Sequence, residues 1–135
     1  MIRIILGFFI ILHGLVHMLY FGQSARYFEL QPGMVWPDGS WAFSRALGDA
    51  AARSLASVLL VLAAIGLAAS GIGILASQSW WRPVILGSTI FSSVIFILFW
   101  DGVAQRLDNQ GAIAILINAA ILAALLIFHW PDFDF

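Results

Sequence analysis

Two histidines in the first apolar stretch are the side chains of this chain best suited to chemistry. His13 and His17 lie four residues apart, so on a helix they point only about 40° apart, on one face. An imidazole can exchange protons near neutral pH, and ionisable groups deep in a membrane are costly and tend to mark sites. Each ring could equally only hydrogen-bond a neighbouring helix. We take both histidines as candidate catalytic and ligand-binding residues.

Charged residues follow at a helical spacing. Arg45, Asp49 and Arg53 are four residues apart in each step, so they share one helix face if the second helix begins near Ser40. Two guanidiniums around one carboxylate leave a net positive group that can hold a phosphate, a carboxylate or a quinone oxygen. The alternative is an interfacial ladder that orients the helix, with the arginine side chains reaching to the water.

Polar residues of the third and fourth apolar stretches reach a similar depth. Ser92, Ser93 and Asn118 are expected roughly 10–12 Å below the membrane surface, at the level of the histidine pair. The serines are expected to make ordinary bonds between helices, whereas the Asn118 amide must satisfy several donors and acceptors. Asp101 directly follows Trp100 and could lean toward the histidines or toward an arginine. We include Asn118 and Asp101 among the candidate ligand-binding residues.

A metal site and a haem site are less favoured interpretations of the same residues. His13, His17 and Asp49 have plausible metal-ligand types, but histidines four apart occur often on helices. Two histidines on one helix cannot straddle a porphyrin, and His129 is expected near the opposite end of the bundle, so a haem with two histidine ligands is not expected. The chain contains no cysteine and no lysine, which excludes thiolate sites and Schiff-base chemistry.

The elements that must position these residues are membrane-spanning helices. Of the 135 residues, 62% are hydrophobic and 10% are charged, against about 25% charged in soluble domains. This composition excludes a soluble enzyme and a nucleic-acid-binding protein. Long unbroken apolar stretches cross a bilayer as helices. We predict an all-α fold, a single transmembrane domain over 1–135 built as an up-and-down four-helix bundle, with spans at about 2–21, 54–76, 83–100 and 111–130.

The two ends of this predicted bundle differ. The loop end holds the polar segment 22–53 and the connection after Trp100, and the terminal end holds both chain termini and one short turn. We expect a polar pocket that opens at the loop end, because the polar residues gather there. The other half is almost wholly apolar, and the absence of a continuous polar path argues against a channel. Arginines are more numerous at the loop end, but two of them alternate with Asp49, so the membrane orientation stays open. Gly7 and Gly14 are expected to serve close helix packing.

The first helix resembles that of DoxX-like integral membrane proteins. The stretch 2–17 has an arginine at Arg3, then Leu6-Gly7, an apolar run and the polar-glycine element His13-Gly14. Four spans in a short chain, with the longest loop after the first, is also similar. The resemblance implies an accessory subunit of a membrane redox system, sometimes quinone-linked, in a prokaryotic cytoplasmic membrane. The resemblance assigns no catalytic residue to this chain.

The sequence thus predicts a small polytopic protein that binds an amphipathic ligand, a quinone or a lipid headgroup. A quinone suits the site because His and Asn side chains can hydrogen-bond its carbonyl groups. A purely structural or assembly subunit of a membrane complex is the alternative, and a metal- or haem-dependent membrane enzyme is the second alternative. Whether the protein is an enzyme is left open. The partners expected are membrane lipid and either further copies of the chain or a larger membrane complex.

Overall fold

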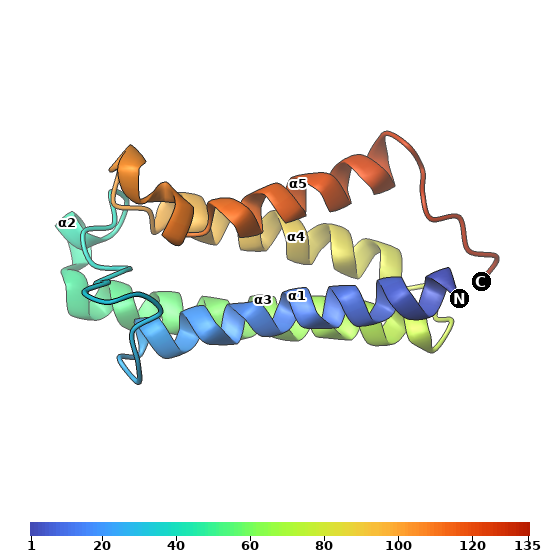
Figure 1. Cartoon of the computed structure of the whole chain (residues 1–135), viewed down its shortest axis with the longest axis horizontal. Coiled ribbons are helices and arrows are strands. Elements are labelled where there is room, and N and C mark those ends of the chain that lie inside the picture. The colour runs from blue at the N-terminus through green and yellow to red at the C-terminus, as the bar shows by residue number, and fades with distance from the viewer.

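The fold is known from a computed structural model that describes residues 1–135, and it consists of helices without strands. In chain order the elements are α1 (Ile2–Ser24), α2 (Ser44–Leu47), α3 (Asp49–Leu75), α4 (Trp81–Leu98), the 3-10 helix η1 (Ala104–Asn109) and α5 (Ala112–Leu126). The four long helices lie side by side along the longest axis of the molecule, with both termini at one end and α2 at the other (Figure 1). The predicted all-α class is confirmed.

Helix packing follows the chain order. Helix α1 packs along α3, α3 packs against α4, and α4 packs against α5. The first and last helices, α1 and α5, do not pack closely on each other, and Figure 1 shows them separated along much of their length. We call the line where they face each other the α1–α5 seam.

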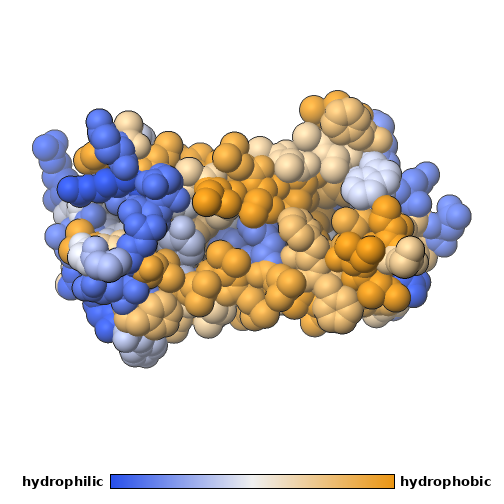
Figure 2. Space-filling model, viewed as in Figure 1, coloured by the Kyte–Doolittle hydropathy of each residue, from blue (hydrophilic) through white to orange (hydrophobic).

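Three of these helices are long and apolar enough to cross a membrane, namely α1, α3 and α4. Apolar side chains cover the middle of the molecule, and hydrophilic ones gather at its two ends (Figure 2). Helix α5 is apolar but has only 15 residues, or about 22 Å at 1.5 Å per residue. The predicted fourth span was 111–130, but its helix ends at Leu126. Pro131 disfavours helical backbone at Trp130, the residue before it, so the helix does not extend that far.

The second long helix does not begin near Ser40, as the sequence suggested. Gly48 has φ 82° and ψ 161°, a conformation open to glycine but strained for other residues. It separates the one-turn helix α2 from α3. Arg45 therefore lies on a different helix from Asp49 and Arg53, and the predicted ladder of three residues on one continuous face is wrong.

Close contact between α1 and α3 depends on glycines, as the sequence predicted for Gly7 and Gly14. A Cβ added at Gly14 would lie 3.1 Å from the Ala64 carbonyl oxygen. A Cβ at Gly71 of α3 would lie 2.6 Å from the carbonyl oxygen of Gly7 and 2.6 Å from Ile11. Backbone therefore meets backbone here, an arrangement that membrane helices use because small residues permit close approach.

Gly71→Ala should lower the free energy of unfolding by about 1–3 kcal/mol, the usual cost of overpacking. The added methyl group has no room because two of its three nearest neighbours, the Gly7 carbonyl oxygen and the Ile11 amide nitrogen, are backbone atoms that cannot turn away. Gly87→Ala is the matched control, since nothing lies within 4 Å of a Cβ at this exposed position of α4. Unfolding of the purified protein in mixed micelles measures both variants, and equal stability of the two would contradict the glycine contact.

Candidate functional site

A group of polar side chains, four of them buried and one half-buried, joins three helices halfway along the molecule. His13 Nε2 lies 2.7 Å from Asn118 Oδ1, and His17 Nε2 lies 2.6 Å from Ser92 Oγ. The Asn118 amide nitrogen donates to Ser92 Oγ at 2.9 Å and to Ser93 Oγ at 3.1 Å. We call these five residues of α1, α4 and α5 the polar network. The structure thus brings together the histidines, the serines and Asn118, which the sequence placed at one depth.

The hydrogen bonds of the polar network have one consistent direction when both rings are neutral. His17 Nδ1 faces the carbonyl oxygen of His13 at 3.0 Å, and a carbonyl only accepts, so Nδ1 carries the proton. His17 Nε2 then accepts from the Ser92 hydroxyl, whose oxygen accepts from Asn118. Asn118 Oδ1 in turn accepts from His13 Nε2–H. The bonds form a directed ring that begins and ends at His13.

This network is closed on the side of the loop end by three aromatic rings. The Phe96 ring lies 5.6 Å from the His17 ring and 5.9 Å from the Trp36 ring, centroid to centroid. The Tyr20 ring contacts both, at 4.9 Å from Phe96 and 5.3 Å from Trp36. Trp36 comes from the loop after α1 and is 0% exposed. We call Tyr20, Trp36 and Phe96 the aromatic plug, and it separates the polar network from the loop end.

Beyond the plug, one carboxylate holds two arginines. Asp38 Oδ1 lies 2.8 Å from Arg53 Nη1 and 2.8 Å from Arg26 Nη2. The sequence suggested Asp49 as the centre of such a group, but Asp49 Oδ1 accepts the backbone N–H of Gly39 at 3.0 Å instead. Asp38 and Arg26 were missed because both lie outside the long helices, where spacing carries no information about which side chains meet.

The remaining charged candidates also lie away from the histidines. Arg45 is exposed and takes no part in the ion pairs of the chain. Asp101 pairs with Arg106 at 3.1 Å and accepts from the Gln110 amide at 3.1 Å, so it does not lean toward His17. The structure therefore does not bring the guanidiniums and the imidazoles together in the polar pocket that the sequence predicted at the loop end. The loop between them is folded into the end of the bundle, and its Trp36 occupies the space.

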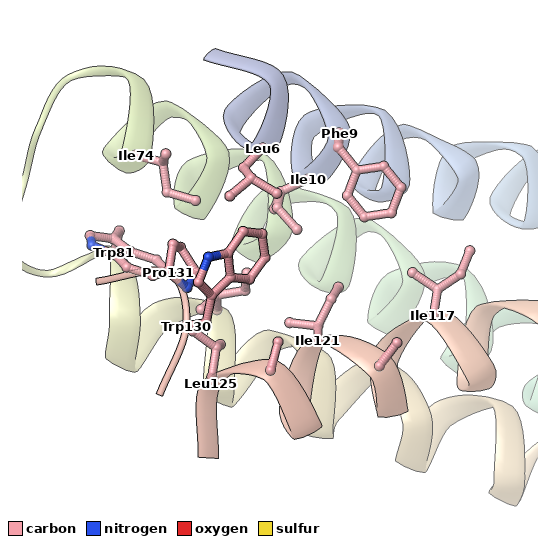
Figure 3. A pocket seen from close by; sticks show the side chains of 13 residues that line it. Leu6, Phe9, Ile10, Ile74, Trp81, Ile117, Ile121, Leu125, Trp130 and Pro131 are labelled. Carbon is pink, nitrogen blue, oxygen red and sulfur yellow. The ribbon is translucent and has the colours of Figure 1, made fainter. Parts of the chain in front are cut away.

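An apolar cavity of about 240 Å³ lies in the other half of the molecule, toward the terminal end. It follows the α1–α5 seam, where α1 contributes Leu6, Phe9 and Ile10 and α5 contributes Ile117, Ile121 and Leu125 (Figure 3). Trp130 of the C-terminal tail points between the two helices toward Leu6 and Ile10. Sequence reasoning missed this cavity, because every lining residue has the type expected of an ordinary membrane helix.

The cavity and the polar network meet at one residue pair. Phe9 lines the cavity, and its ring lies parallel to the His13 ring at 6.5 Å between centroids. Within the network His13 keeps 4% of its surface accessible and Ser93 is half-buried, while His17, Ser92 and Asn118 are 0% exposed. Figure 2 shows a small hydrophilic area in the seam, halfway along the molecule and surrounded by apolar side chains. The apolar cavity is thus connected to the His13 imidazole through the stacked ring of Phe9.

Nowhere does the structure gather three or more His, Asp or Glu side chains in a metal-binding arrangement. The predicted candidates His13, His17 and Asp49 divide between the middle of the bundle and its loop end, since Asp49 binds Gly39 while the histidines bind Asn118 and Ser92. The chemistry open to the polar network is therefore hydrogen bonding and proton exchange by its imidazoles.

Ser92→Ala should lower the free energy of unfolding by about 1 kcal/mol, because it breaks the ring and leaves the His17 nitrogen without a donor. Ser70→Ala is the matched control. Ser70 is equally buried, but its hydroxyl donates only to Gly66 of its own helix, at 2.7 Å. The two variants are compared by unfolding in mixed micelles, and a Ser92 effect no larger than the Ser70 effect would show that the ring contributes nothing to stability.

Comparison with known proteins adds no relative to these observations. No family model, no curated protein and no solved structure matches the chain. The resemblance of residues 2–17 to DoxX-like proteins therefore stays a prediction, and the function is inferred from the seam, the cavity and the polar network.

Proposed function

We propose that the protein is an integral membrane protein, built as an up-and-down four-helix transmembrane bundle, that binds a small lipophilic molecule in the α1–α5 seam. The molecule lies in the apolar cavity and turns its single polar group toward His13. The observation that carries this proposal is the cavity of about 240 Å³, whose lining residue Phe9 stacks on the buried imidazole of His13, which keeps a small accessible surface. A hollow with apolar walls and few convergent polar groups is the usual form of a small-molecule site.

The route into the cavity supports a ligand that comes from the lipid. Helices α1 and α5 do not pack closely on each other, so the cavity adjoins the acyl-chain region rather than water. The aromatic plug and the charged loop lie over the opposite end of the polar network. A ligand dissolved in the bilayer can therefore enter sideways, whereas a water-soluble one meets a closed end.

Quinone-type molecules, in their oxidised or reduced form, and lipids remain the favoured ligand classes. Aromatic rings at the cavity, among them Phe9, Trp81 and Trp130, offer flat apolar faces against which a ring or a chain can pack. A quinone-linked accessory subunit of a membrane redox system, the role that the DoxX-like resemblance implies, fits this arrangement. The polar group of the ligand would then face His13, while its apolar part lies along α5.

A purely structural role is the second candidate, and one observation favours it. The polar network is fully hydrogen-bonded within the protein except at one ring nitrogen of His13. Such a network can fix the register of α1 against α4 and α5 without any ligand. In that case the cavity is a packing defect in which no molecule binds specifically.

Ala120→Phe separates the two candidates, because Ala120 lines the cavity and a phenyl ring there fills the space. We expect the variant to lose at least about nine-tenths of any lipophilic molecule that the wild type retains through purification, with an unchanged melting temperature. Organic extraction and mass spectrometry of protein purified in mild detergent measure the loss.

The control is Ala119→Phe, because Ala119 is the neighbouring residue on α5, is likewise exposed and is not part of the cavity. It should retain the molecule. If wild type, Ala119→Phe and Ala120→Phe all give the same extract as empty detergent micelles, the binding proposal fails and the structural role stands.

A further inference from the structure

We infer that the ligand of the seam carries a hydroxyl group and donates its proton to Nδ1 of His13. This inference rests on the proposed function and narrows the ligand to lipophilic alcohols, phenols or quinols, as opposed to carbonyl compounds such as quinones. It follows from a count of the donors and acceptors that the polar network leaves free.

Every donor of the polar network is already used within the protein. The two amide protons of Asn118 go to Ser92 and Ser93. The hydroxyl of Ser92 donates to His17 Nε2, and that of Ser93 donates to the Thr89 carbonyl oxygen at 2.9 Å. The ring protons of the histidines go to Asn118 Oδ1 and to the His13 carbonyl oxygen. A ligand carbonyl, which can only accept, would find no partner here.

Nδ1 of His13 is the one side-chain nitrogen of the polar network that makes no hydrogen bond. In the directed ring His13 carries its proton on Nε2, so Nδ1 holds a lone pair. No hydrogen bond of the structure uses this atom, and it is not among the fully buried polar atoms that lack a partner. The small accessible area of His13 is therefore compatible with a donor that approaches Nδ1 from the seam.

The ring of His13 stays neutral in this setting. A second proton on it would place a positive charge among Phe9, His17 and Asn118, where no carboxylate compensates it. Two carboxylates of the loop end, Asp38 and Asp101, are paired with arginines there. Charge in an apolar environment is costly without a partner, so His13 offers an acceptor rather than a second donor.

The geometry also orients the ligand. Phe9 joins the cavity to the His13 ring, so a hydroxyl on His13 directs the apolar part of the ligand along Ile117 and Ile121 of α5 (Figure 3). The ligand would then lie along the seam, with its hydroxyl near the middle of the bilayer and its apolar part toward the terminal end. Trp130 would cover the far end of that apolar part.

Two pairs of probes test the inference on the purified chain in nanodiscs. One pair is 1-dodecanol and dodecyl methyl ether, and the other is tetramethylhydroquinone and tetramethylbenzoquinone. We expect the hydroxyl member of at least one pair to bind about threefold to tenfold more tightly than its mate, which one neutral hydrogen bond provides. A preference in the first pair identifies an aliphatic alcohol, and a preference in the second identifies a phenol or quinol.

His13→Gln is the matching variant, because its amide can still donate to Asn118 but has no ring Nδ1. It should bind dodecyl methyl ether as the wild type does and lose the preference for 1-dodecanol. Nitrogen-15 NMR of wild-type His13 gives a second measurement that needs no variant. Its Nδ1 signal should move on addition of the hydroxyl probe and stay in place with the ether.

The failures of the two proposals are distinguishable. If both members of each pair bind equally tightly, the hydroxyl inference is overturned. If Ala120→Phe also prevents this binding, the proposed binding site is still supported. A preference for the quinone over the hydroquinone would overturn the hydroxyl inference too. If none of the four probes binds, the proposed function fails, and the inference fails with it.

Discussion

The hydrogen bond between His13 and Asn118 is the contact on which the middle of this molecule depends. It joins the first long helix to the last at 2.7 Å, across a seam where those helices do not pack closely. In apolar surroundings an imidazole or an amide must find a partner within the protein, so α1 and α5 are held together at this level. Toward the terminal end no such contact holds them, and there the cavity lies.

The two halves of the molecule consequently differ in what can reach the histidines. At the loop end Trp36 is inserted among the helices, and the Asp38 carboxylate ties α3 to the loop through Arg53 and to the end of α1 through Arg26. Water is thereby kept from His17 by packed rings. At the terminal end the cavity has apolar walls and lies along a seam where α1 and α5 do not pack closely. One closed and one open side give the proposed site a direction of entry.

Much of this arrangement was predictable from the sequence, because depth in a membrane helix is residue number multiplied by a fixed rise. That rule alone placed His13, Ser92 and Asn118 at one level, and the structure joins them. Composition and unbroken apolar stretches were likewise enough to indicate helices.

Other features have no periodic signal. Gly48 interrupts a pattern that reads as a continuous helix, and a single residue in an unusual conformation cannot be inferred from its neighbours. Asp38 meets Arg53, 15 positions further along the chain, and this pairing depends on how the loop before α2 folds. The cavity is the space left between side chains such as Leu6, Phe9 and Ile117. Such a space depends on how the helices pack, and residue type alone does not predict it.

The energy of the polar network points to its role. Hydrogen bonds between membrane helices contribute only about 0.6 kcal/mol each on average, and replacing both partners of a pair by apolar groups of the same shape is often nearly neutral. Leucines in place of the polar network would therefore give almost the same stability. What apolar residues cannot do is hold an imidazole at a fixed rotation with a known protonation pattern. The ring through His17, Ser92 and Asn118 does so, because each donor in it has a single acceptor to satisfy, and the consequence is one defined lone pair on His13 beside an apolar hollow.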